Sequence, residues 1–150
     1  MSKFVFNLSP LVRVTTVEKS KVELELSNKL LELKQHQDQL SREHYNIKEM
    51  LSETESLLLK GKSITIFSQP YVLNEKLLNV KLLKEKIILL ELERDKIVAK
   101  LGKIIGKINK LDDIRIEKLT DYKRELAKKD QEVMEEVYRN KNITLKIIND

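Results

Sequence analysis

The apolar residues between Val80 and Leu111 recur at alternating steps of three and four, the spacing of one stripe along an α-helix. They are Val80, Leu83, Ile87, Leu90, Ile97, Leu101, Ile104, Ile108 and Leu111, and Arg94 is the polar member of the same series. Lys, Glu and Asp occupy most of the other positions. So narrow a stripe cannot enclose a globular core, and it is typical of a helix that packs on one partner helix through knobs-into-holes contacts.

A second helical pattern precedes this one and supplies the partner. Ser9 and Pro10 suit an N-cap and a first helical position, and neither Gly nor Pro follows until Gly61. The predicted seam positions of this helix are Leu26, Leu30, Leu33, Gln37, Leu40, His44, Ile47, Leu51, Thr54 and Leu58. We therefore predict one coiled-coil domain over residues 1–150, with helix one at about 10–60, a bend at 61–69 and helix two at about 70–145.

Two long helices with a short connection should fold back on each other. The fold class predicted is all-α: a long antiparallel two-helix coiled-coil hairpin with an overhanging C-terminal helix, because helix two is longer by roughly 25 residues. Pairing that is symmetric about the bend places Leu11 near Leu119 or Asp121 and Arg94 opposite Gln37, with His44 as a packing residue of the seam.

The overhang still carries apolar residues, namely Leu119, Tyr122, Leu126, Val133 and Val137. This stripe predicts a partner outside the hairpin, although dimerisation or fraying could also account for it. Gly102 and Gly106 lie inside helix two, and we favour close approach of the partner helix, or simple tolerance, over a hinge.

Composition excludes several classes of protein. The net charge of +5 has interleaved signs, which argues against a nucleic-acid surface. No apolar run approaches the roughly 20 residues of a membrane span, and the first ten residues do not form a credible signal peptide. There is no cysteine, no catalytic triad pattern, and no metal-ligand cluster, while Gly61-Lys62-Ser63 lacks the upstream glycine of a phosphate loop. We expect a cytoplasmic protein that is not an enzyme and has no cofactor.

Three segments resemble the flagellar export protein FliJ family. The opening FVFNLSPLVRV (residues 4–14) is similar to the F-x-F-x-L-x-P-L-like start of that family. The segments IEKLTDYK (116–123) and DQEVMEE (130–136) resemble its C-terminal motifs, although Glu132 and Val133 depart from them. Gly61, Phe67 and Tyr71 are similar to its central bend.

The resemblance implies a stalk protein of a flagellar or virulence type III export apparatus. Such proteins insert into the hexameric export ATPase and promote its ring assembly, contact the cytoplasmic domain of the export-gate membrane protein, and in some members handle export chaperones. It implies a protein that is monomeric when free and peripherally associated with the cytoplasmic face of the inner membrane. The ATPase-facing residues would be Phe4, Phe6, Leu11, Leu119, Tyr122, Leu126, Gln131 and Met134, and the gate-facing residues Tyr45, Phe67 and Tyr71. The alternative is an unrelated structural or tethering coiled coil, such as a homodimeric scaffold.

Overall fold

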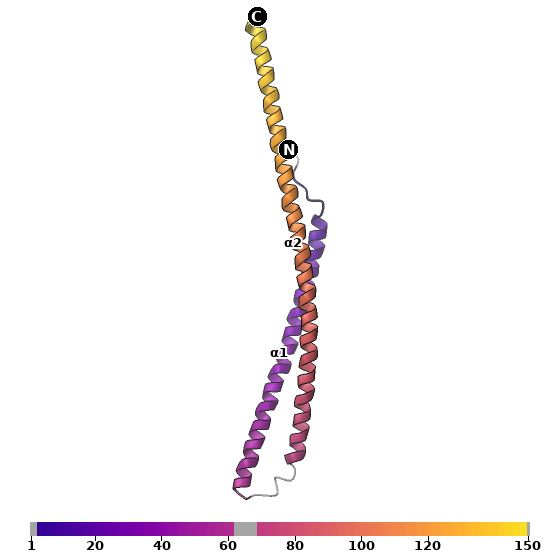
Figure 1. Ribbon diagram of the computed structural model, residues 1–150, viewed down its shortest axis with the longest axis vertical. Coiled ribbons are helices and arrows are strands. Elements are labelled where there is room, and N and C mark those ends of the chain that lie inside the picture. Colours follow the sequence, from indigo (N-terminus) through magenta and orange to yellow (C-terminus); the bar gives the residue numbers. More distant parts are fainter. Residues whose placement is uncertain (1–2, 62–68, 150) are drawn as a thin grey trace. The chain divides into compact units, whose positions relative to one another are not determined.

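Two long helices form almost all of the chain in the computed structural model, which describes residues 3–61 and 69–149. Helix α1 spans Ser9–Leu59 and helix α2 spans Gln69–Asn149 (Figure 1). Over the described residues there is no strand, and the predicted all-α hairpin is confirmed. Contacts divide the chain into two compact units: unit 1 comprises Met1–Val17 and Ile104–Asp150, and unit 2 comprises Glu18–Lys103.

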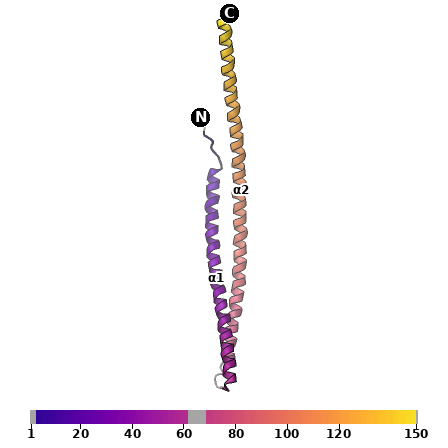
Figure 2. The same cartoon turned by 90° about the vertical axis from the view of Figure 1, so that its left-hand side faces the viewer.

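Unit 2 contains the antiparallel hairpin itself (Figures 1 and 2). Its buried side chains are apolar and come from both helices: Val22, Leu33 and Ile47 from α1, and Val80, Ile87, Leu90 and Ile97 from α2. Leu90 is the most completely enclosed, with 1% of its surface exposed. Because burial of apolar surface is the dominant favourable term in folding, this seam holds the two helices together.

The stripe predicted on α2 is confirmed at every position. Its members from Val80 to Leu111 are buried or half-buried, and so is Arg94. Ile104, Ile108 and Leu111 continue the stripe within unit 1. We call this side of α2 the inner stripe.

The seam of α1 differs from the prediction at every second position. The series Leu26, Leu33, Leu40, Ile47 and Thr54 is buried or half-buried as expected, but the alternating positions lie one residue earlier. They are Lys29, His36, Glu43, Met50 and Leu57, all half-buried, whereas Leu30, Gln37, His44, Leu51 and Leu58 are exposed. The aliphatic part of a long charged side chain can cover apolar surface while its charged end stays in water. The continuous apolar stripe on α2 therefore accepts the stems of such residues.

The register of the hairpin differs from the one that symmetry about the bend predicts. Lys29 Nζ lies 2.6 Å from Glu93 Oε2 across the two helices. Lys29, and not Gln37, therefore lies opposite this turn of α2, a displacement of about two helical turns. The predicted pairing of Arg94 with Gln37 is wrong, and the Arg94 guanidinium instead contacts the neighbouring carboxylate of Asp95 at 3.1 Å.

The glycines differ in their backbone conformations. Gly61, next to the end of α1, has φ of 73°, the left-handed conformation favoured by glycine at helix C-termini. A methyl group added at Gly102 or Gly106 would meet no atom within 4 Å. Close approach of a partner helix is therefore wrong as an explanation for these two glycines.

Candidate functional site

The N-terminal segment before α1 packs on α2 within unit 1. Phe6 is buried, and the Phe4 ring lies 5.5 Å, centroid to centroid, from that of Tyr122, tilted by 47°. The Ser9 amide donates to the Phe6 carbonyl at 3.1 Å, which closes a tight turn immediately before the helix. Two residues predicted for one surface, Phe4 and Tyr122, are thus in contact.

The first turns of α1 lie beside an earlier part of α2 than expected. Val12 lines a small pocket of about 170 Å³ with residues on α2: Ile108, Asn109, Leu111, Asp112 and Arg115. Leu11 is half exposed, while its carbonyl accepts a hydrogen bond of 2.7 Å from the buried Thr15 hydroxyl. The expectation that Leu11 lies near Leu119 or Asp121 is wrong, because Val12, the next residue of α1, lies against residues 108–115 of α2.

Burial on α2 ends a short distance beyond Tyr122, where the N-terminal segment packs on the helix. Leu119, Tyr122 and Leu126 are half-buried, and they are the last such residues among the side chains of α2 that the structure describes. From 127 to 148 every described side chain is exposed, and the helix continues alone to Asn149 (Figure 1). Three of the predicted ATPase-facing residues therefore lie where α2 loses its cover, and Gln131 and Met134 lie beyond.

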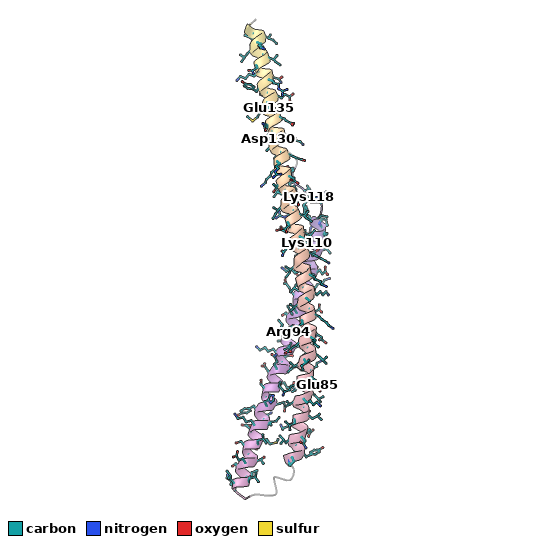
Figure 3. All side chains as sticks on the ribbon, in the orientation of Figure 1. Glu85, Arg94, Lys110, Lys118, Asp130 and Glu135 are labelled. Atoms are coloured by element: carbon teal, nitrogen blue, oxygen red, sulfur yellow. The ribbon has the colours of Figure 1, made fainter. Side chains whose placement is uncertain are left out.

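The uncovered part of α2 presents large apolar side chains to solvent. Met134 is 73% exposed and, with Gln131, Glu135, Tyr138 and Arg139, lines an open hollow of about 410 Å³ on the helix surface. Glu135 is among the residues labelled in Figure 3, and its carboxylate accepts a hydrogen bond of 3.4 Å from the Gln131 amide. We call residues 127–148 the exposed end of α2.

Sequence reasoning overlooked part of this surface. Tyr138, Leu145 and Ile148 are exposed members of the same heptad series as Met134. The series steps by four and three from Gln131 to the last turn, and Lys141 interrupts it. That spacing could be recognised in the sequence, but the prediction followed Val133 and Val137 and so placed the apolar stripe one position away.

The charged residues of the exposed end occur in three groups along its length. Lys128 and Lys129 come first, four acidic residues fall within 130–136, and three basic residues fall within 139–146. Around the described residues there is no group of three or more His, Cys, Asp or Glu side chains that could hold a metal ion. The chemistry available to this surface is burial of apolar side chains together with contacts to charged groups, as in protein–protein recognition.

The predicted gate-facing residues lie in different surroundings. Tyr45 on α1 is exposed, and its hydroxyl donates to a Glu49 carboxylate oxygen at 2.9 Å. That hydrogen bond to the carboxylate, and the negative charge beside it, raise the pKa of Tyr45. Tyr71 is exposed near the start of α2, and Phe67 lies outside the described residues.

Together the fold and this surface define a coiled-coil-like helical hairpin in which the C-terminal helix extends past its partner. Among the described residues, neither helix contains an apolar stretch of the length that a membrane span requires. No family model, curated protein or solved structure matches the chain.

Proposed function

We propose that this protein is a non-enzymatic stalk component of a bacterial flagellar or related type III protein export apparatus. The exposed end of α2, together with the N-terminal segment, enters the central opening of the hexameric export ATPase and promotes assembly of its ring. The protein works in the cytoplasm, peripherally associated with the inner membrane at the export apparatus, and serves flagellum biogenesis and motility or protein secretion. Handling of export chaperones is a further role.

One observation carries this proposal: the exposed end of α2 is helical and presents large apolar side chains, yet none of the described residues covers it. A single helix gains little stability from propensity alone, and most helical stability comes from packing of an apolar face. Met134 and Tyr138 are 73% and 67% exposed and line the same hollow, and contiguous exposed apolar side chains are typical of interaction surfaces. A closed ring supplies a surrounding surface on which such a helix can be buried.

Support also comes from the residues that resemble the FliJ family. The opening FVFNLSPLVRV provides Phe4 and Phe6, which fasten the N-terminal segment onto α2 next to Tyr122. The segments at 116–123 and 130–136 lie on the stretch of α2 where burial ends. The part of the hairpin near the end of α1 and the start of α2, where Tyr45 and Tyr71 are exposed, contacts the export gate.

Truncation after Leu119 tests the proposal with purified export ATPase. We expect the truncated chain to lose its stimulation of ATPase oligomerisation and activity while it still binds the cytoplasmic domain of the gate protein. The substitution Met134→Glu should reproduce the loss in the full-length chain, whereas Tyr71→Ala, which alters another exposed side chain, should leave ATPase stimulation intact. Normal activation by the truncated chain would refute the assignment of this end to the ATPase.

A structural or tethering coiled coil is the second candidate. The observation that favours it is a further row of exposed leucines on α2, outside both the seam and the exposed end. A scaffold of this kind should show no affinity for the export ATPase in a pull-down at micromolar concentration. Saturable binding to the ATPase would therefore decide in favour of the stalk.

A further inference from the structure

A second stripe of leucines follows α2 within unit 2. Leu78, Leu82, Leu89 and Leu92 are 54%, 54%, 56% and 55% exposed, although each is a large apolar side chain. They belong to a series with steps of four and three that runs Leu78, Leu82, Glu85, Leu89, Leu92, Lys96 and Ala99. We call this series the outer stripe.

The outer stripe points away from α1. Successive residues of an α-helix turn by about 100°, so the direction of Leu89 differs greatly from the mean direction of Ile87 and Leu90. The burial agrees, because Ile87 and Leu90 are enclosed in the seam while Leu89 is more than half exposed. Helix α2 is thus apolar on two sides, and the hairpin covers one of them.

We propose that the outer stripe pairs with the outer stripe of a second copy of this chain, with the two α2 helices antiparallel. In an antiparallel coiled coil, each residue at one apolar heptad position lies opposite a residue at the other apolar heptad position of the second helix. In the register that best matches the outer stripe in this way, Leu89 lies opposite Leu92 of the second copy, and Leu82 lies opposite Ala99. Glu85 then lies opposite Lys96, and the symmetry of the pair repeats each of these contacts.

Charge complementarity selects this occupant and this direction. The two polar members of the outer stripe, Glu85 and Lys96, are both exposed and of opposite sign. A parallel pair in register would place Glu85 against its own copy and Lys96 against its own copy, and such repulsion inside a seam is unfavourable. The antiparallel register replaces both repulsions with Glu–Lys contacts.

The pairing is expected to be weak and reversible. It uses about three heptads, a small interface of the kind below about 1,200 Å² that is typical of transient complexes. We therefore expect monomers in dilute solution and dimers as the concentration rises through the micromolar range. The monomer that the FliJ resemblance implies is then the form present in dilute solution. Residues 78–99 do not overlap the residues proposed to enter the ATPase, so dimerisation and ATPase binding use separate surfaces.

Sedimentation equilibrium of the full-length chain tests the surface. We expect a reversible monomer–dimer equilibrium, and we expect the double substitution Leu89→Gln/Leu92→Gln to raise the dissociation constant at least ~10-fold by removing the central layers. Leu31→Gln is the matched control, because Leu31 is a leucine of α1 that is 57% exposed and lies outside the outer stripe. Circular dichroism checks that the helices persist. A monomer throughout the micromolar range, or an equal effect of Leu31→Gln, would overturn the proposal.

Disulfide formation tests the direction and register, because the chain has no cysteine of its own. One preparation carries Glu85→Cys and another carries Lys96→Cys, and the two are mixed and oxidised mildly. The mixed dimer keeps one native Glu–Lys contact, so the heterodisulfide should be the dominant product. Dominance of the disulfide between two Glu85→Cys chains indicates parallel pairing and overturns the proposed arrangement, as does the absence of disulfide.

Discussion

Substitution of Leu90 by alanine measures how much of the stability depends on the seam. Leu90 has 1% of its surface exposed, so the full transfer free energy of the deleted methine and two methyl groups is lost, together with a contribution from the cavity left behind. A seam between two helices can close partly around the gap, which places the loss near the lower end of the range for buried leucines. We expect the free energy of unfolding to fall by about 2–3 kcal/mol, and the melting temperature by about 5–10 °C for a chain of this size.

Urea unfolding followed by circular dichroism gives this free-energy difference directly. Leu31→Ala is the control, because it deletes the same atoms from a leucine that is 57% exposed on α1. It should cost less than about 1 kcal/mol. Equal losses from Leu90→Ala and Leu31→Ala would show that the seam is not where the hairpin derives its stability, and the packing described above would be refuted.

Four further substitutions, used in three experiments, test separate features of the structure. Gly102→Ala should raise the free energy of unfolding by about 1 kcal/mol, because the added methyl group meets no atom within 4 Å; a lower melting temperature would contradict the open space found there. The hydrogen bond between Lys29 and Glu93 raises the pKa of Lys29 from 10.5 and lowers the pKa of Glu93 from 4.5. The contribution of the pair is therefore present at neutral pH, is lost as pH falls through the lowered pKa of Glu93 or rises through the raised pKa of Lys29, and weakens in salt. Glu93→Gln should accordingly lower the melting temperature at pH 7 but not in strong acid, and a constant difference across pH would exclude this pair as the cause. A double-mutant cycle with Phe4→Ala and Tyr122→Ala should give a coupling of about 0.5–1.5 kcal/mol, measured by urea unfolding, and additive effects would rule out the ring contact.

The inner stripe of α2 could be predicted at every position because it is the longer and less interrupted of the two apolar series on this helix. From Val80 to Leu111 its single polar member is Arg94, whereas the outer stripe is interrupted by both Glu85 and Lys96. Where two faces of a helix carry apolar residues at heptad spacing, the more continuous series indicates the face that packs in the seam. The end of α1 was equally readable, since Gly61 is suited to the left-handed conformation that terminates a helix.

The face of α1 was ambiguous for a physical reason. Leu26, Leu33, Leu40 and Ile47 repeat every seven residues, and a heptad accepts a second seam position either three or four residues after each of them. Apolar Leu30 favoured four, but the structure uses three and buries the stem of Lys29 instead. Sequence rules that count a lysine as polar cannot foresee this choice.

The candidate site was predicted in part. The aromatic residues Phe4 and Tyr122 were assigned to one surface and they do contact each other. The unequal lengths of the helices predicted an overhang, but the prediction placed Leu119, Tyr122 and Leu126 on it, whereas these three residues are half-buried and burial ends after Leu126. The prediction missed Tyr138 because it assigned the apolar stripe to the neighbouring positions that include Val137. The predicted position of Leu11 was wrong because the predicted axial offset of the two helices was wrong. Periodicity gives the face of a helix, whereas the axial offset of two helices depends on matching layers between them.

The two sides of the seam differ in polarity, and this difference has a consequence for the exchange of one helix for another. The side of α1 that meets α2 includes Lys29, His36 and Glu43, so α1 can be hydrated readily if it detaches. The side of α2 that it leaves is a nearly unbroken row of Leu, Ile and Val. Detachment of α1 would therefore expose a strongly apolar helix-binding surface on α2 and a much more polar one on α1. The apolar surface of α2 would then determine which foreign helix could take the place of α1.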